Sequence, residues 1–383
     1  MATLPREAHI HLSTKIVTPY IIDLIPYSLR IVFLAVLSAC GMLAVALSPD
    51  DTDARSLAGK IGGIVLANIS SGAGEVNFLS LTHYYGHFSL AAWGSGTGGA
   101  GLIGAGVYTL VTTTLGFSVR GTLLSSILLS VVMLISYFIL LPLGPLKSAQ
   151  KNRKGYQQVD ADEAEAPEHE SSGLLEQPSE RSFSQAYQRH QSVVKQALSD
   201  LKTKLLRARS LVVPYMIPLF LVYLAEYTIN QGVAPTLLFP LEESPFKHFR
   251  AFYPTYGTIY QLGVFISRSS LPFIRIRSLY VPTLLQVVNL AALTAHALWP
   301  FVPTVWFVFA IIFWEGLLGG LVYVSTFAAI REEVLDEERE FSLGAATVSD
   351  SAGIFFAGLL GAGMETALCR WQVAHGRDWC RRL

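Results

Sequence analysis

The chain has 383 residues, of which 51% are hydrophobic and only 15% are charged. Soluble domains are nearer a quarter charged, so this composition argues against a soluble protein. The formal net charge is zero, which leaves no electrostatic basis for binding nucleic acid.

The hydrophobic residues are collected in long runs that end at charged or turn-forming residues. About 20 helical residues cross the hydrocarbon core of a bilayer, so each run of that length predicts a membrane span. Residues 14–26 are apolar but too short to span, and they look like the end of a broken or truncated helix. Nine longer runs predict an all-α polytopic membrane protein with spans at roughly 27–48, 58–82, 90–116, 121–143, 210–232, 252–270, 278–299, 303–329 and 341–365.

A hydrophilic segment, residues 144–209, divides the chain into residues 1–143 with about four spans and residues 210–383 with about five. Its acidic, apolar-poor centre is typical of disorder. Both of its membrane-proximal ends are basic, so the positive-inside rule predicts that the segment is cytosolic. Apolar residues at helical spacing near its end predict an amphipathic helix before the fifth span. Counting spans onward places the C-terminus on the lumenal side.

The same segment contains Glu170, three further residues, and then Leu174 and Leu175. This spacing fits an acidic dileucine sorting motif, which adaptors bind as an extended peptide. Such binding requires a disordered cytosolic segment, which is what surrounds the motif. The pattern therefore predicts adaptor-dependent sorting to a lysosome or vacuole, although a chance match is the alternative.

Four carboxylates lie inside predicted spans: Glu75, Glu226, Glu315 and Asp350. A charge at the bilayer centre is costly, so such a residue usually faces the interior of the helix bundle and has a function. The four residues indicate proton-linked chemistry or recognition of a polar solute; structural ion pairs between helices are the alternative. Arg268 ends the sixth span and is either an interfacial anchor or an internal counter-ion.

Polar amides close to these charges complete the set of candidate residues for a solute or proton site. They are Asn77, Asn230, Gln231 and Gln261. A glycine-rich stretch, residues 94–106, opens the third span, and close helix packing explains it better than a helix unwound around a solute. No catalytic signature is present, and Cys40, Cys369 and Cys380 form no metal site. We therefore expect no enzyme, cofactor or metal; the last two cysteines could pair.

Several longer stretches resemble one known family, in the expected order along nearly the whole chain. They are residues 24–28 (LIPYS), 70–82 (SSGAGEVNFLSLT), 93–102 (WGSGTGGAGL), 223–232 (YLAEYTINQG), 260–271 (YQLGVFISRSSL), 315–323 (EGLLGGLVY) and 340–350 (EFSLGAATVSD). The family is battenin, which comprises the Batten disease protein and its fungal vacuolar relatives. Matches of this length are far more specific than the short motifs above.

This resemblance implies a fold similar to major-facilitator transporters, with two helix bundles, eleven spans and a long cytosolic loop after the sixth. The first span of that pattern has no counterpart here, and residues 14–26 resemble the end of the second. Nine predicted spans and the two missing ones then make eleven. We expect either a truncated gene model or a real variant.

The resemblance also implies a multi-pass protein of the vacuolar or lysosomal membrane, with roles in organelle pH homeostasis and in transport of basic amino acids. Animal relatives are linked to glycerophosphodiester export. The expected partners are membrane lipid, a small polar solute of one of these kinds, protons and sorting adaptors. The alternative is a membrane scaffold that regulates vacuolar pH or trafficking without transporting a solute.

Overall fold

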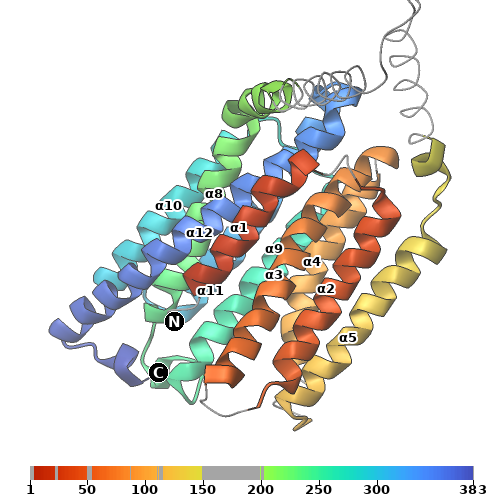
Figure 1. The fold of residues 1–383 in the computed structure, drawn as a ribbon. Helices are drawn as coiled ribbons and strands as arrows, with labels where there is room; N and C mark the ends of the chain where they lie inside the picture. Colours follow the sequence, from red (N-terminus) through yellow and green to blue (C-terminus); the bar gives the residue numbers. More distant parts are fainter. Residues whose placement is uncertain are drawn as a thin grey trace, which may run out of the picture.

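The computed structural model describes residues 4–21, 25–49, 54–86, 88–109, 111, 115–148, 199 and 202–382, and this part of the chain is helical without a strand (Figure 1). The first half contributes α1 (Leu4–Ile21), α2 (Tyr27–Leu47), α3 (Ala54–Leu81), α4 (Phe88–Thr109) and α5 (Val119–Ile135). The second half contributes α8 (Ile217–Thr228), α9 (Phe252–Ser269), α10 (Tyr280–Leu298), α11 (Val305–Glu333) and α12 (Asp336–Ala374).

Every predicted span coincides with a helix, but not every helix has the composition of a span. Within the described residues, six helices are long and apolar enough to cross a membrane, namely Tyr27–Leu47, Val119–Leu140, Lys202–Thr236, Tyr280–Leu298, Val305–Glu333 and Asp336–Ala374. The predicted count of nine is therefore not confirmed. The three remaining ranges fall on α3, α4 and α9, whose glycine, hydroxyl and charged residues lower their mean hydropathy.

The helix α8 is the central part of a longer helix, Lys202–Thr236. A π-helical turn at Val212–Met216 precedes it, and a second one at Ile229–Val233 follows. π-Helical turns inside α-helices often occur at functional sites. The second turn carries Asn230 and Gln231, two of the candidate residues. The predicted disordered centre and the dileucine motif lie outside the described residues.

The first helix differs from the expectation for residues 14–26. α1 begins at Leu4 and continues through Pro19 to Ile21, so it is an 18-residue helix. It packs against both α3 and α12, and Figure 1 shows it lying along α12 among helices from the second half of the chain. A segment that looked like a helix remnant therefore contributes to the contact between the two halves.

Small residues allow the two halves to approach closely. α4 is continuous through its glycines, and a Cβ atom on Gly98 would lie 3.1 Å from Phe265 Cα on α9. Gly94 is equally close to α9, because a Cβ there would meet the Arg268 carbonyl oxygen at 3.0 Å. Such close approach is the usual role of small residues between membrane helices. The prediction that this stretch serves helix packing is confirmed.

The outer surface is strongly apolar, as expected for contact with lipid. Large hydrophobic side chains are exposed along α5 and the π-helical segment Ser136–Leu140 that follows it, including Leu128, Leu129 and Ile139. Contiguous apolar surface on this scale is rare in soluble monomers. At the other end of the chain, Cys369 and Cys380 form a disulfide between α12 and the short helix Trp379–Arg382. The pairing that the sequence left open is therefore present.

Candidate functional site

Lys15 on α1 is buried and forms the centre of an ion cluster. Its Nζ atom lies 2.6 Å from Glu75 Oε2 on α3, and 3.1 and 3.2 Å from the two carboxylate oxygens of Asp350 on α12. Buried charges persist in proteins when they are paired and hydrogen-bonded. The cluster therefore joins three helices, two from the first half of the chain and one from the second.

Neutral polar groups complete this cluster. Tyr323 on α11 donates its hydroxyl proton to Glu75 Oε1 at 3.1 Å and accepts a hydrogen bond from Trp93 Nε1 at 3.1 Å. His11 Nδ1 on α1 lies 3.2 Å from Ser351 Oγ, one residue beyond Asp350. The Glu75 side chain retains 22% of its accessible surface, whereas Lys15 retains 1%. Glu75 is thus the member of the pair that water or a solute can reach.

Arg268 points inward from the last turn of α9. Its Nη1 donates to Thr97 Oγ1 on α4 at 3.0 Å, and its Nη2 donates to the Tyr223 hydroxyl on α8 at 2.8 Å. The guanidinium carbon lies 4.0 Å from the centre of the Tyr323 ring, a cation–π contact. Of the two predicted roles, these contacts favour the internal one. Arg268 is an internal cation, and its direct partners are hydroxyl groups and an aromatic ring.

Tyr323 connects these two groups of residues. Its hydroxyl contacts Glu75 while its ring lies beneath Arg268. The ion cluster and the internal arginine therefore belong to one polar layer between the two halves of the chain. We call Lys15, Glu75, Asp350, Arg268 and Tyr323 the interface cluster.

Glu226 and Glu315 lie together in the second half of the chain, apart from the interface cluster. Tyr260 on α9 donates a hydrogen bond to Glu226 Oε1. Asn230 Nδ2 lies 3.4 Å from Glu315 Oε1, a long contact. Both carboxylates are buried, with exposures of 2% for Glu226 and 0% for Glu315. This arrangement brings three sequence-predicted residues into one place.

Three predicted residues join neither group. Asn77 is buried, donates to the Ala73 carbonyl at 2.7 Å, and lies 3.4 Å from an Arg30 nitrogen on α2. Gln231 packs against α12 near Gly361, and Gln261 lies against Gly101 of α4. These side chains satisfy local contacts between helices.

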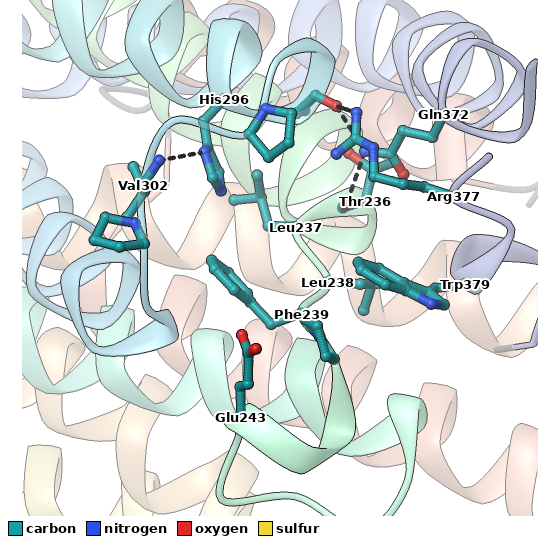
Figure 2. A pocket seen from close by; sticks show the side chains of 14 residues that line it. Thr236, Leu237, Leu238, Phe239, Glu243, His296, Val302, Gln372, Arg377 and Trp379 are labelled. Atoms are coloured by element: carbon teal, nitrogen blue, oxygen red, sulfur yellow. Dashed lines mark hydrogen bonds between the residues drawn. The ribbon is translucent and has the colours of Figure 1, made fainter. Parts of the chain in front are cut away.

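A separate cavity of about 220 Å³ lies where α10 and α12 end (Figure 2). Phe239, His296 and Trp379 line it, and Arg377 bonds to the carbonyl oxygens of Ala297 and Leu298 at its edge. None of the sequence-predicted residues lines this cavity. We place the candidate site at the interface cluster, because buried charges that bridge several helices are the costlier and more specific feature.

The interface cluster offers two kinds of recognition chemistry. Carboxylates such as Glu75 and Asp350 bind ammonium and guanidinium groups, whereas lysine and arginine bind carboxylate and phosphate groups. Sequence reasoning identified Glu75, Asp350 and Arg268 but missed Lys15, His11, Tyr323 and Trp93. The available signal for Lys15 was a single lysine within an otherwise apolar stretch.

Comparison with known proteins gives similarity along nearly the whole chain. A family model described as CLN3 protein matches residues 9–371. Protein btn1 of Aspergillus fumigatus is 55% identical, and the match covers 97% of this chain and 81% of that protein. Protein btn-1 of Neurospora crassa is 56% identical with the same coverage. Protein BTN1 of Yarrowia lipolytica is 47% identical over 96% of this chain and 85% of its own length.

Proposed function

Because this chain belongs to the CLN3 (battenin) family, we propose that it is a transporter-like protein of the vacuolar or lysosomal membrane. Six helices long and apolar enough to span a bilayer support the membrane part of this proposal. The observation that carries the transport part is the Lys15 ion cluster. It joins α1 and α3 to α12, so its ion pairs lie where two helix bundles would rock against each other. A major-facilitator-like mechanism, with one central site between two bundles, is part of the proposal.

The solute we propose is small and polar, with a basic amino acid as the first candidate. Its ammonium or guanidinium group would compete with Lys15 for Glu75 and Asp350, whereas Arg268 and Lys15 would attract its carboxylate. A glycerophosphodiester is the second candidate, because its phosphate would bind the two cations. The two candidates differ in how they would interact with Lys15. A basic amino acid would displace Lys15 from the carboxylates of Glu75 and Asp350, whereas the phosphate of a glycerophosphodiester would bind to Lys15 itself.

Two features of the sequence support vacuolar or lysosomal residence and the proposed orientation. The acidic dileucine, Glu170 with Leu174 and Leu175, would be read by sorting adaptors in the cytosol. The disulfide between Cys369 and Cys380 lies at the end of the chain that counting spans from the cytosolic segment assigns to the lumen. Disulfides persist in oxidising compartments and are rare in the cytosol. Transport of charged solutes by this protein would also affect organelle pH.

Flux measurements in proteoliposomes test the proposal. The purified full chain should accumulate labelled arginine under a pH gradient, and Glu75→Gln and Asp350→Asn should abolish accumulation while the protein remains folded. Glu338→Gln is the matched control, because Glu338 forms a partly exposed ion pair with Arg207 far from the interface cluster. Unchanged flux in both cluster variants would contradict the proposed site. Labelled glycerophosphodiester is tested in parallel.

The alternative function is a scaffold that regulates vacuolar pH through partner proteins. The long hydrophilic segment 144–209 with its dileucine motif favours this reading. Deleting the segment and directing the protein to the vacuole by a fused signal separates the two functions. A scaffold loses its effect on vacuolar pH after this deletion, whereas a transporter keeps its flux.

A further inference from the structure

Glu226 on α8 and Glu315 on α11 lie one helical turn apart across two packed helices. A Cβ atom on Gly319 would lie only 2.5 Å from the Glu226 carboxyl carbon, so Glu226 faces Gly319. Four residues further on, in the π-helical turn that continues α8, Asn230 faces Glu315 at 3.4 Å. Four residues make about one turn, or about 6 Å of helix. The two carboxylates therefore occupy neighbouring layers of one buried interface.

The surrounding helices leave one oxygen of each carboxylate without a hydrogen-bond partner. Tyr260 donates to Glu226 Oε1 and Asn230 to Glu315 Oε1, but Oε2 of both glutamates is buried and unpartnered. Close glycine packing excludes larger groups, since a Cβ on Gly263 would lie 3.1 Å from Leu317 N. Each carboxylate of the pair thus has one buried acceptor atom for which the described residues supply no donor.

The charged and titratable groups around the pair are unevenly distributed. From α9, Glu226 faces the Tyr260 hydroxyl and is acted on by the cation Arg268. On α8 itself, Tyr223 and Tyr227 lie near Glu226. The Asp350 carboxylate of α12 interacts electrostatically with both tyrosines.

Glu315 has weaker hydrogen bonding and less favourable electrostatic surroundings than Glu226. The charged group that acts on it is Glu226, a second carboxylate. Lys15 is engaged by Glu75 and Asp350, and Arg268 by Thr97 and Tyr223. No cation therefore balances Glu315 among the described residues.

An ionised carboxylate in such a site is strongly unfavourable, and a second negative charge nearby makes it more so. The simplest neutralising ligand is a proton, which also supplies the missing donor. We propose that the Glu226–Glu315 pair is an exchangeable proton site, with Glu315 the main carrier. It shares no hydrogen bond or ion pair with the interface cluster among the described residues, although Arg268 acts electrostatically on Glu226, and its link to transport rests on the proposed function. A metal ion would need more ligands, and the described residues bring no three His, Cys, Asp or Glu side chains together around one ion.

Infrared difference spectroscopy tests the site without any solute. The full-length wild-type protein in proteoliposomes should show the carbonyl band of a protonated buried carboxyl group, which shifts in D2O and disappears at alkaline pH. Glu315→Gln should lose this band, Glu226→Gln should change its titration midpoint, and Glu315→Asp should retain a band. Glu338→Gln, at a partly exposed ion pair, should leave it unchanged.

Two outcomes would overturn the proposal. The first is a band of the same intensity and titration midpoint in Glu315→Gln, Glu226→Gln and wild type. The second is loss of the wild-type band on adding sodium chloride at constant pH, which would identify a sodium site instead. The wild-type titration decides the question even if a glutamine variant fails to fold, because absence of any titratable carboxyl band also overturns it. A titratable band without solute flux would support the proton site and refute the proposed transport. Flux that does not depend on pH, without the band, would support the proposed transport and refute the proton site.

Discussion

The Nζ atom of Lys15 lies 3.1 Å from Asp350 Oδ1, although 335 residues separate them in the chain. The pair joins the first described helix to the last long one. Glu75 binds the same lysine at 2.6 Å, so a single cation holds three helices together. This dependence makes Lys15 the residue whose loss should have the largest structural effect.

Lys15→Ala should destabilise the protein, because it leaves the buried carboxylate of Asp350 and the partly buried carboxylate of Glu75 without their cation. Breaking a buried ion pair by removing one partner costs about 3–5 kcal/mol. Thermal unfolding in detergent, followed by tryptophan fluorescence, should show a markedly lower Tm. Adding Asp350→Asn to Lys15→Ala should recover part of the loss. An unchanged Tm in Lys15→Ala would contradict the ion cluster.

Arg268→Lys should reduce solute flux more than it reduces stability. Lysine cannot contact Thr97 and Tyr223 with the planar fork that arginine uses, and it stacks less well on Tyr323. A hydrogen bond to a charged group is worth about 1.5–3 kcal/mol, so flux should fall about tenfold or more. Arg275→Lys is the control, because Arg275 is half exposed and pairs with Glu332. Equal flux in the two variants would argue against a role for Arg268.

Gly316→Ala should destabilise the contact of α9 with α11. The new methyl group would lie 3.0 Å from Val264 N and 3.2 Å from Gly263 Cα, so the helices must separate. Overpacking of this kind costs about 1–3 kcal/mol. Gly96→Ala is the control, because no atom lies within 4 Å of a Cβ there. Thermal unfolding should show a lower Tm for Gly316→Ala and an equal or higher Tm for Gly96→Ala.

Glu340 closes the end of the bundle that is predicted to face the cytosol. Its carboxylate accepts hydrogen bonds from Tyr27 at 2.6 Å and from Tyr84 at 2.5 Å, both in the first half of the chain. The double variant Tyr27→Phe with Tyr84→Phe should therefore open this end more often. Buried Thr82, replaced by cysteine in a Cys40→Ser background, should then react faster with a membrane-impermeant maleimide. If the cysteine at position 82 reacts at the same rate with and without the Tyr27→Phe and Tyr84→Phe substitutions, the hydrogen bonds to Glu340 do not keep this end of the bundle closed.

His83 should make stability sensitive to acid. It lies beyond the end of α3, its Nδ1 atom is buried without a partner, and burial lowers the pKa of the imidazole. The unfolded chain therefore binds more protons as the pH falls below about 6.5, so the contribution of His83 is complete above that pH and is lost as the pH falls toward the folded-state pKa. The Tm of His83→Gln should decrease less than that of wild type between pH 7 and pH 5, whereas exposed His248→Gln should follow wild type.

The sequence by itself determined the helical class and the position of every long helix except α1. Hydrophobic runs of about 20 residues leave little alternative to a helix in a bilayer, because each backbone polar group must be satisfied within its own segment. The same reasoning identified Glu75, Glu226, Glu315 and Asp350, since a carboxylate in such a run is costly and conspicuous. The exact number of spans was harder, because α4 and α9 carry the glycines and polar groups that pack inside the bundle.

Tertiary structure alone decided which of these residues meet. Helical periodicity tells which face of a helix a residue occupies, but not which helix lies opposite or in what register. Asp350 therefore became half of an ion pair with Lys15, while Glu226 and Glu315 were left in neighbouring layers of one buried interface, with no cation at Glu315 among the described residues. The segment containing Lys15 looked like a helix remnant in the sequence, and its role emerged only when packing against α3 and α12 placed the lysine between two carboxylates. The environment of a buried charge depends on its neighbours in space, and for Lys15 one of them, Asp350, lies 335 residues away in the chain.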